Sequence, residues 1–179
     1  NTDIFWGESS QEADMYDYLS HTEETKVFGI KVKRLTTTYD FIALCLHHYK
    51  DLNSLYLLWK RGISLSTFCD IYYYLEKIPL DTQELKQICN KLNVAEYVYC
   101  SIFQTNIVFE RSKLRKCLNE LVPVNAKSLH KRIGLSENQY KQLPDFIANY
   151  AFDENFHQVL DNLLTTEEIE QIKTNDLFL

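Results

Sequence analysis

Three residues that could do chemistry, His47, Lys50 and Asp70, stand among apolar residues within residues 39–75. A buried imidazole, ammonium or carboxylate needs a partner whatever its purpose. The functional interpretation is that His47 pairs with Asp70 of the next helix, which fixes the imidazole tautomer, while Lys50 reaches a phosphate in the cleft beside them. The structural alternative places His47 at the edge of an apolar helix face, hydrogen bonded to a carbonyl or a carboxylate.

A run of three tyrosines at residues 72–74 follows Asp70. Aromatic rings can stack on a base or a sugar, so Tyr73 joins His47, Lys50 and Asp70 as a predicted substrate- or nucleotide-binding residue. The alternative is that these rings fill the core of a helical protein. On the first helix, the spacing of His47 and His48 means that both histidines cannot face the core equally.

The sequence predicts no metal site and no nucleophile. The five cysteines have no CxxC spacing and lie beside apolar neighbours, which is typical of reduced core residues. His21, His130 and His157 are scattered along the chain. There is no P-loop, no GxGxxG and no GxSxG motif.

Composition limits the class of protein. The chain has 179 residues, 45% of them hydrophobic, and a formal net charge of -6, which argues against a dedicated nucleic-acid binder. No apolar run of 18 residues and no charged-then-apolar leader is present, so we expect a cytoplasmic protein without a membrane partner. Four Gly and 3 Pro against 12 Tyr and 10 Phe favour a mainly α fold with long helices.

Three regions are expected along the chain. Residues 1–36 form an irregular segment and a β-hairpin. Within them, residues 3–7 are a short strand or a loop, and the polar residues 8–25 are a mobile loop with at most one helical turn. Residues 26–35 alternate around a central Gly, as in a small hairpin or a bulged strand.

Residues 37–122 are predicted to be a helical bundle. Thr38 caps a helix that runs to Leu52, a loop carries Trp59, and Ser64 or Ser66 caps a second helix that Pro79 ends. Asp81 and Glu84 predict a capping box for a third helix. Residues 94–109 and 113–121 are the fourth and fifth helices, the latter amphipathic.

Residues 123–179 are predicted to be a C-terminal helical extension. Gly134 and Pro144 break their apolar clusters, and a capping box at Thr165 and Glu168 opens a last short helix. This region is either a separate helical subdomain or an extended packing arm.

A family resemblance covers residues 27–109. The hairpin ending in KVKRL, the helix FIALCLHHYKD and the helix TFCDIYYYL resemble the helical half of a bacterial family of uncharacterised nucleotidyltransferases, often found beside peptide natural-product and polysaccharide gene clusters. That family has an LxxH helix, matched by Leu44 to His47, then an Asp-Ile or Asp-Leu pair, matched by Asp70, then a helix opening with an acid, matched by Asp81.

The resemblance implies an α+β protein in which a catalytic core with a Gly-Ser turn and paired aspartates precedes the helical half. Such a core would use Mg²⁺ with a nucleoside triphosphate. This sequence has no recognisable pair of that kind, so we expect the helical substrate- or nucleotide-binding portion of a nucleotidyltransferase-like protein, acting on a small-molecule or peptide acceptor if a core exists upstream. The alternative is a non-enzymatic helical module for protein interaction, immunity or regulation.

Overall fold

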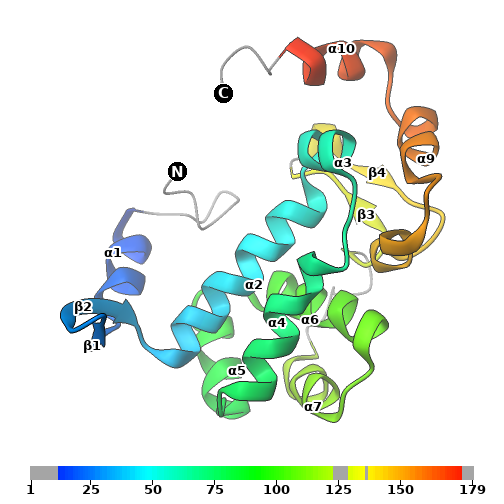
Figure 1. Ribbon diagram of the computed structural model, residues 1–179. Helices are drawn as coiled ribbons and strands as arrows, with labels where there is room; N and C mark the ends of the chain where they lie inside the picture. Colours follow the sequence, from blue (N-terminus) through cyan, green and yellow to red (C-terminus); the bar gives the residue numbers. More distant parts are fainter. Residues whose placement is uncertain (1–11, 123–128, 136, 175–179) are drawn as a thin grey trace.

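The computed structural model describes residues 12–122, 129–135 and 137–174, and it confirms a mainly α fold with a β-hairpin near the N-terminus (Figure 1). The strand or loop predicted at residues 3–7 lies outside the described residues. Among those that are described, no helix combines the length and apolar character needed to cross a bilayer.

The N-terminal region is more regular than predicted. In place of the expected mobile loop, residues 12–27 form helix α1 (Glu12–Ser20) and strand β1 (Thr22–Val27), which pairs antiparallel with β2 (Ile30–Leu35). The hairpin therefore starts at Thr22 rather than at residue 26. Phe28 and Gly29 form its turn with positive φ, as in a type I′ turn. The Tyr18 hydroxyl donates to the Tyr39 carbonyl oxygen, which anchors α1 on the bundle.

Six helices follow in close succession. They are α2 (Thr37–Asn53), α3 (Leu55–Arg61), α4 (Ser66–Lys77), α5 (Thr82–Lys91), α6 (Ala95–Phe109) and α7 (Ser112–Leu121). The loop predicted around Trp59 is wrong, because Ser54 caps α3 by accepting a hydrogen bond from the Leu57 amide. Trp59 then reaches the C-terminal region, where its indole N–H donates to Asp161.

Several predicted caps have other roles. Thr36 is the N-cap residue of α2, and Thr38 is buried two residues further on, in the first turn, where its hydroxyl donates to the Glu84 carboxylate. Asp81 caps α5 as predicted, by accepting from the amides of Gln83 and Glu84. The Glu84 side chain is thus bound to α2 instead of completing a capping box. Neither Ser64 nor Ser66 is the N-cap of α4, because Leu65 holds that position.

The first core lies between α2 and α6, with α4, α5 and α7 packed around them (Figure 1). Helix α6 carries apolar residues on most of its surface, since it is covered on several sides, and it contributes Val98 and Ile102 to this core. Figure 1 shows the hairpin and α1 at one end of α2, and α3 with the C-terminal segments at the other.

The C-terminal region shares a second core with the ends of α2, α3 and α4. It contains β3 (Arg132–Ile133) paired with β4 (Lys141–Gln142), the 3₁₀ helices η1 (Glu137–Gln139) and η2 (Ile147–Phe152), α9 (Phe156–Leu163) and α10 (Thr166–Thr174). Leu143 and Leu160 pack in one cluster with Leu58 and Phe68. Thr165 and Glu168 exchange the two hydrogen bonds of the predicted capping box. The region therefore packs against the bundle and adds a small sheet to the predicted helices.

Candidate functional site

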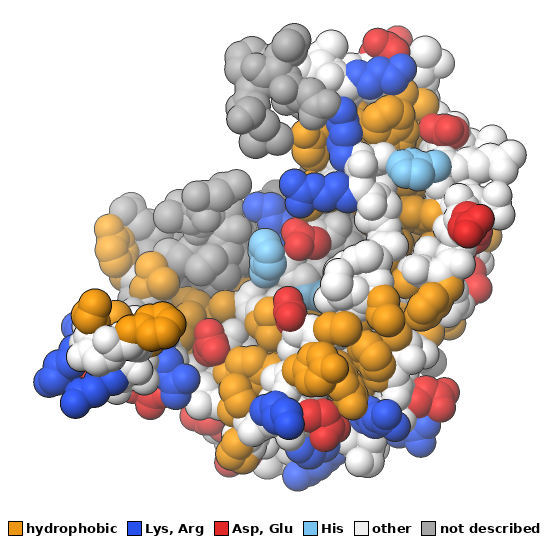
Figure 2. Space-filling view, viewed as in Figure 1, with side chains coloured by type: hydrophobic (Ala, Val, Ile, Leu, Met, Phe, Trp, Pro, Cys, Tyr) orange, Lys and Arg blue, Asp and Glu red, His pale blue; other side chains and the backbone are white. Residues whose placement is uncertain are grey.

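Helices α2 and α4 line a cavity of about 280 Å³ that is rich in polar side chains. Helix α2 presents residues spaced by three and four positions, which places them on one face of the helix. The lining residues from α2 are Leu44, His47, His48 and Asp51, and those from α4 are Ser66, Thr67 and Asp70. Figure 2 shows His side chains and carboxylates gathered at the centre of this face, over α2 and α4.

His48 is the buried polar residue of this cavity. His48 is only 4% exposed, and its ring packs edge-on against that of Phe68, with 5.4 Å between the ring centroids. Neither ring nitrogen has a hydrogen-bond partner among the described residues. Burial, with a smaller contribution from His47, lowers the pKa of His48 to about 3. The imidazole is therefore neutral at physiological pH and offers one donor and one acceptor that no described residue satisfies.

His47 lies at the exposed side of the same cavity, as the spacing of the two histidines predicts. Its Nε2 atom is 3.4 Å from the Oδ2 atom of Asp51, one turn further along α2. The sequence interpretation paired His47 with Asp70 instead. Both residues line the cavity, so the structure brings them to one site, but the carboxylate that lies beside the His47 imidazole is that of Asp51.

The other two predicted site residues lie elsewhere. Lys50 is half-buried on α2 and does not line this cavity. Tyr73 is 56% exposed, and its ring contacts Tyr72 edge-on at 5.0 Å. Tyr73 is therefore on the surface of α4, outside the cavity. Of the four predicted residues, His47 and Asp70 line the cavity, and Lys50 and Tyr73 do not.

A second cavity of about 210 Å³ continues the first toward α3. The two share Asp51 and Thr67 as lining residues, so we treat them together as the α2–α4 groove. The second cavity is lined by Arg61 and Gly62, at the end of α3, and by Ser64. Arg61 is exposed, and its guanidinium has no hydrogen bond or ion pair with any described residue. One end of the groove thus carries His47, His48 and Asp70, and the other end carries the cationic side chain of Arg61.

Sequence reasoning missed Arg61, Asp51 and the inward role of His48. The signal for His48 and Asp51 is their spacing from Leu44, which puts all three on one helical face. Arg61 gives no such signal, because its place depends on how α3 turns back at Gly62, whose φ of 65° suits only glycine readily.

The described residues of the groove do not form a site for the Mg²⁺ that the family resemblance implies. Within residues 12–122, 129–135 and 137–174, no group of three or more His, Cys, Asp or Glu side chains could hold a metal ion. Asp51 and Asp70 line one cavity but do not form such a group. No chemical step is therefore derived through Mg²⁺ in this part of the chain.

Comparison with known proteins identifies the family. A family model described as uncharacterised nucleotidyltransferase matches residues 1–110, a range that includes α1 to α6 and every residue of the α2–α4 groove. No curated protein and no solved structure matches the chain. The family model spans more than half of the sequence, and the chain therefore belongs to this family of uncharacterised nucleotidyltransferases.

Proposed function

We propose that the α2–α4 groove binds the nucleotide substrate of this nucleotidyltransferase-like protein. The observation that carries the proposal is His48, a buried neutral imidazole that lines the cavity and whose two ring nitrogens have no hydrogen-bond partner among the described residues. Leaving such a group unsatisfied costs about 1 to 3 kcal/mol. A ligand with a donor and an acceptor at this position would recover that free energy on binding.

The charges of the groove suggest an orientation for the nucleotide. Arg61 supplies a guanidinium that can hold a phosphate through two hydrogen bonds, with the hydroxyls of Ser64 and Thr67 beside it. Asp51 and Asp70 would repel a phosphate, but their carboxylates accept hydrogen bonds from ribose hydroxyls or from the amino group of a base. We therefore place the phosphates at Arg61 and the nucleoside at the His48 end.

The predicted site residues fit this proposal unequally. His47 and Asp70 take the substrate-binding role at the nucleoside end. A role for Lys50 or Tyr73 stays a prediction, and it would require a substrate that extends beyond the groove. Transfer of the nucleotidyl group to a small-molecule or peptide acceptor, with Mg²⁺, also stays a proposal and depends on carboxylates of a catalytic core.

The test is the thermal stability of this chain with ATP, CTP, GTP and UTP, each with and without Mg²⁺. Ligand at about 100 times its Kd stabilises the folded state by about 2.7 kcal/mol, which raises the midpoint of unfolding. We expect at least one nucleotide to raise the midpoint. With Arg61→Gln or with His48→Leu, about tenfold more nucleotide should be needed for the same rise in midpoint, which is the effect of losing one good hydrogen bond.

Lys60→Gln is the matched control, because it removes a neighbouring charge on α3 that does not line the groove. An equal loss of nucleotide response in Lys60→Gln and Arg61→Gln would contradict the proposed orientation. The absence of a shift with any nucleotide would contradict the proposal as a whole.

A second candidate function, the protein-interaction module, has support from the hairpin. Val27, Ile30 and Val32 lie on one side of it and are exposed, with Phe28 exposed at the turn. Figure 2 shows apolar side chains gathered at the edge of the molecule where Figure 1 places the hairpin, above basic side chains. A partner protein that covers this side would bury apolar area now in contact with water. Loss of partner binding in Phe28→Ser, with the nucleotide response absent, would favour this candidate.

A further inference from the structure

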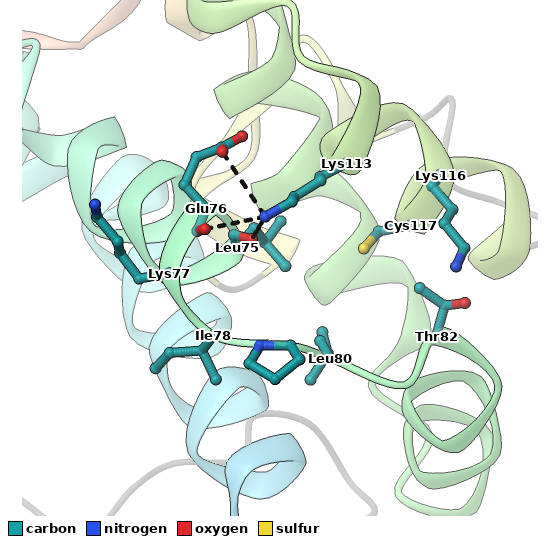
Figure 3. Close-up of a pocket in the computed structure, with 10 residues that line it drawn as sticks. Leu75, Glu76, Lys77, Ile78, Leu80, Thr82, Lys113, Lys116 and Cys117 are labelled. Carbon is teal, nitrogen blue, oxygen red and sulfur yellow. Dashed lines mark hydrogen bonds and ion pairs between the residues drawn. The ribbon is translucent and has the colours of Figure 1, made fainter.

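A separate cavity of about 370 Å³ lies at the opposite end of α4 from the groove residues Ser66 and Thr67 (Figure 3). It is formed where α4 ends, where the chain turns into α5, and where α7 packs across both. This cavity and the α2–α4 groove share no lining residue. It is therefore a distinct feature of the surface.

One side of this cavity is apolar. Leu75 and Cys117 are buried behind it, and the connection from α4 to α5 contributes Ile78, Pro79 and Leu80. Figure 3 shows the connection residues along one side of the pocket, facing the helix that carries Lys113. Burial raises the pKa of the Cys117 thiol to about 11, so this sulfur is an apolar wall atom and not a nucleophile. A hydrocarbon or aromatic body would displace water from this side favourably.

Lys113 already has a structural role in the cavity wall. Its ammonium donates to the carbonyl oxygens of Leu75 and Glu76, at 2.9 and 3.0 Å, and lies 3.7 Å from the Glu76 carboxylate. These bonds satisfy carbonyl groups in the last turn of α4. The Lys113 ammonium is therefore used in holding α7 to the end of α4, and Figure 3 shows its bonds as dashed lines.

Unlike Lys113, the polar residues Lys116 and Thr82 of this cavity do not hold its wall together through hydrogen bonds. Lys116, one turn after Lys113 on α7, has no hydrogen bond or ion pair with any described residue. Thr82, at the start of α5, is only 6% exposed, yet its hydroxyl also lacks a hydrogen bond within the described part of the chain. Figure 3 shows the Lys116 side chain extending toward Thr82. An ammonium and the hydroxyl of a largely buried threonine thus lie together beside an apolar wall.

We infer that this cavity is a second binding site, for a small organic anion with an apolar body. The apolar body would lie against Ile78 and Leu80, and the anionic head would accept hydrogen bonds from the Lys116 ammonium and the Thr82 hydroxyl. A carboxylate and a phosphate ester share this chemistry. Glu76 does not oppose the anion with an unpaired charge, because Lys113 lies beside its carboxylate.

The test is calorimetric titration of the whole chain with octanoate and with octyl phosphate. Acetate supplies the charge without the apolar body, and octanol supplies the body without the charge. We expect saturable binding of octanoate, octyl phosphate or both, with acetate and octanol at least tenfold weaker, since each lacks one half of the interaction. The stronger of the two anions identifies the preferred head group.

Variants then locate the site. Lys116→Gln should weaken binding by about tenfold, the loss expected for one charge-assisted hydrogen bond. Thr82→Val removes the hydroxyl at nearly constant shape and should weaken binding by several-fold. Arg115→Gln is the matched control, because it removes a charge from the same helix at a residue that pairs with Glu110 and does not line the cavity.

Three outcomes would overturn the inference. They are the absence of saturable binding of either anion to the unchanged chain, octanol binding as tightly as both anions, and an equal effect of Lys116→Gln and Arg115→Gln. Circular dichroism of each variant distinguishes lost binding from lost folding. Because Lys116 is exposed, its replacement should leave the spectrum and the unfolding midpoint unchanged.

Discussion

The Ser101 hydroxyl on α6 donates a hydrogen bond of 2.7 Å to the Cys45 carbonyl oxygen on α2. Ser101 is 1% exposed, and Cys45 is fully buried beside it. The bond joins the two helices that form the centre of the first core. A small side chain at position 101 lets their backbones approach closely enough for this contact.

Ser101→Ala should lower the free energy of unfolding by about 1 kcal/mol, the usual net value of one buried hydrogen bond. The loss is modest because alanine adds no volume and keeps the helix. Urea denaturation measures it. Ser112→Ala, at an exposed position of α7, is the control and should change stability by less than about 0.5 kcal/mol. Equal values for the two variants would contradict a role of this bond in helix packing.

Stability should fall with decreasing pH because of His48. Its pKa in the folded state is about 3, against 6.5 as the ordinary value, so the unfolded chain binds a proton that the folded chain does not. The stabilisation is complete above the ordinary pKa and is lost as pH falls toward the folded one. The slope should approach about 1.4 kcal/mol per pH unit between roughly pH 6 and 4.

His48→Leu is the matched variant for the pH experiment. It keeps an apolar contact with Phe68 and removes the titrating ring, while His47, Asp51 and Asp70 stay in the same cavity. Over this window its stability should depend on pH much less than that of the unchanged chain, as measured by urea denaturation at each pH. A variant that retains the slope of the unchanged chain would show that another group causes it.

Two glycines with positive φ should respond differently to alanine. Gly62 has φ of 65° with no atom within 4 Å of the place that an alanine methyl group would take, whereas at Gly134, with φ of 104°, that place is 2.5 Å from the Gln139 carbonyl oxygen. Gly62→Ala should cost about 1 to 2 kcal/mol from backbone strain alone. Gly134→Ala should cost more, because the methyl group also meets backbone. Thermal unfolding of both variants tests the order, which the reverse ranking would contradict.

An ion pair anchors the last helix to the small C-terminal sheet. Lys141 on β4 lies 2.8 Å from the Glu168 carboxylate on α10, and both side chains are partly buried. Burial alone would raise the pKa of Glu168, but hydrogen bonds from Lys141 and Thr165 outweigh it, and the pKa lies below its ordinary value. The stabilisation is therefore present above the ordinary pKa and is lost as pH falls through the folded one.

A double-mutant cycle with Lys141→Met and Glu168→Gln should give a coupling free energy of about 1 kcal/mol near neutral pH. Hydrogen exchange of the α10 amides should accelerate in either single variant, since the helix then opens more easily. At a pH below the folded pKa of Glu168 the coupling should vanish. A coupling that is unchanged by acid would contradict the charge of Glu168 as its cause.

The local sequence pattern was a good guide wherever a helix carries its own signals. The helices predicted at residues 94–109 and 113–121 agree with α6 and α7 to within one residue at each end. The Asp81 cap and the capping box of Thr165 and Glu168 also form, since a cap uses residues only two or three positions apart.

Prediction failed where distant contacts decide the local structure. The polar residues before the hairpin have no apolar period of their own, yet α1 forms with Tyr18 buried against Tyr39. Strand β1 is stabilised by ion pairs across the hairpin, such as Glu23 with Arg34. The helix at Trp59 likewise depends on packing against the C-terminal region, which no window around residue 59 contains.

The sequence by itself determined the mainly helical class through its composition, the family through the order of its motifs, and the unequal burial of His47 and His48 through the angle of about 100° between successive helix residues. Only the tertiary structure decided that Asp70 shares a cavity with both histidines and that Arg61 lies at one end of the groove. These relationships depend on how α2, α3 and α4 pack, and packing is set by contacts between residues far apart in the chain.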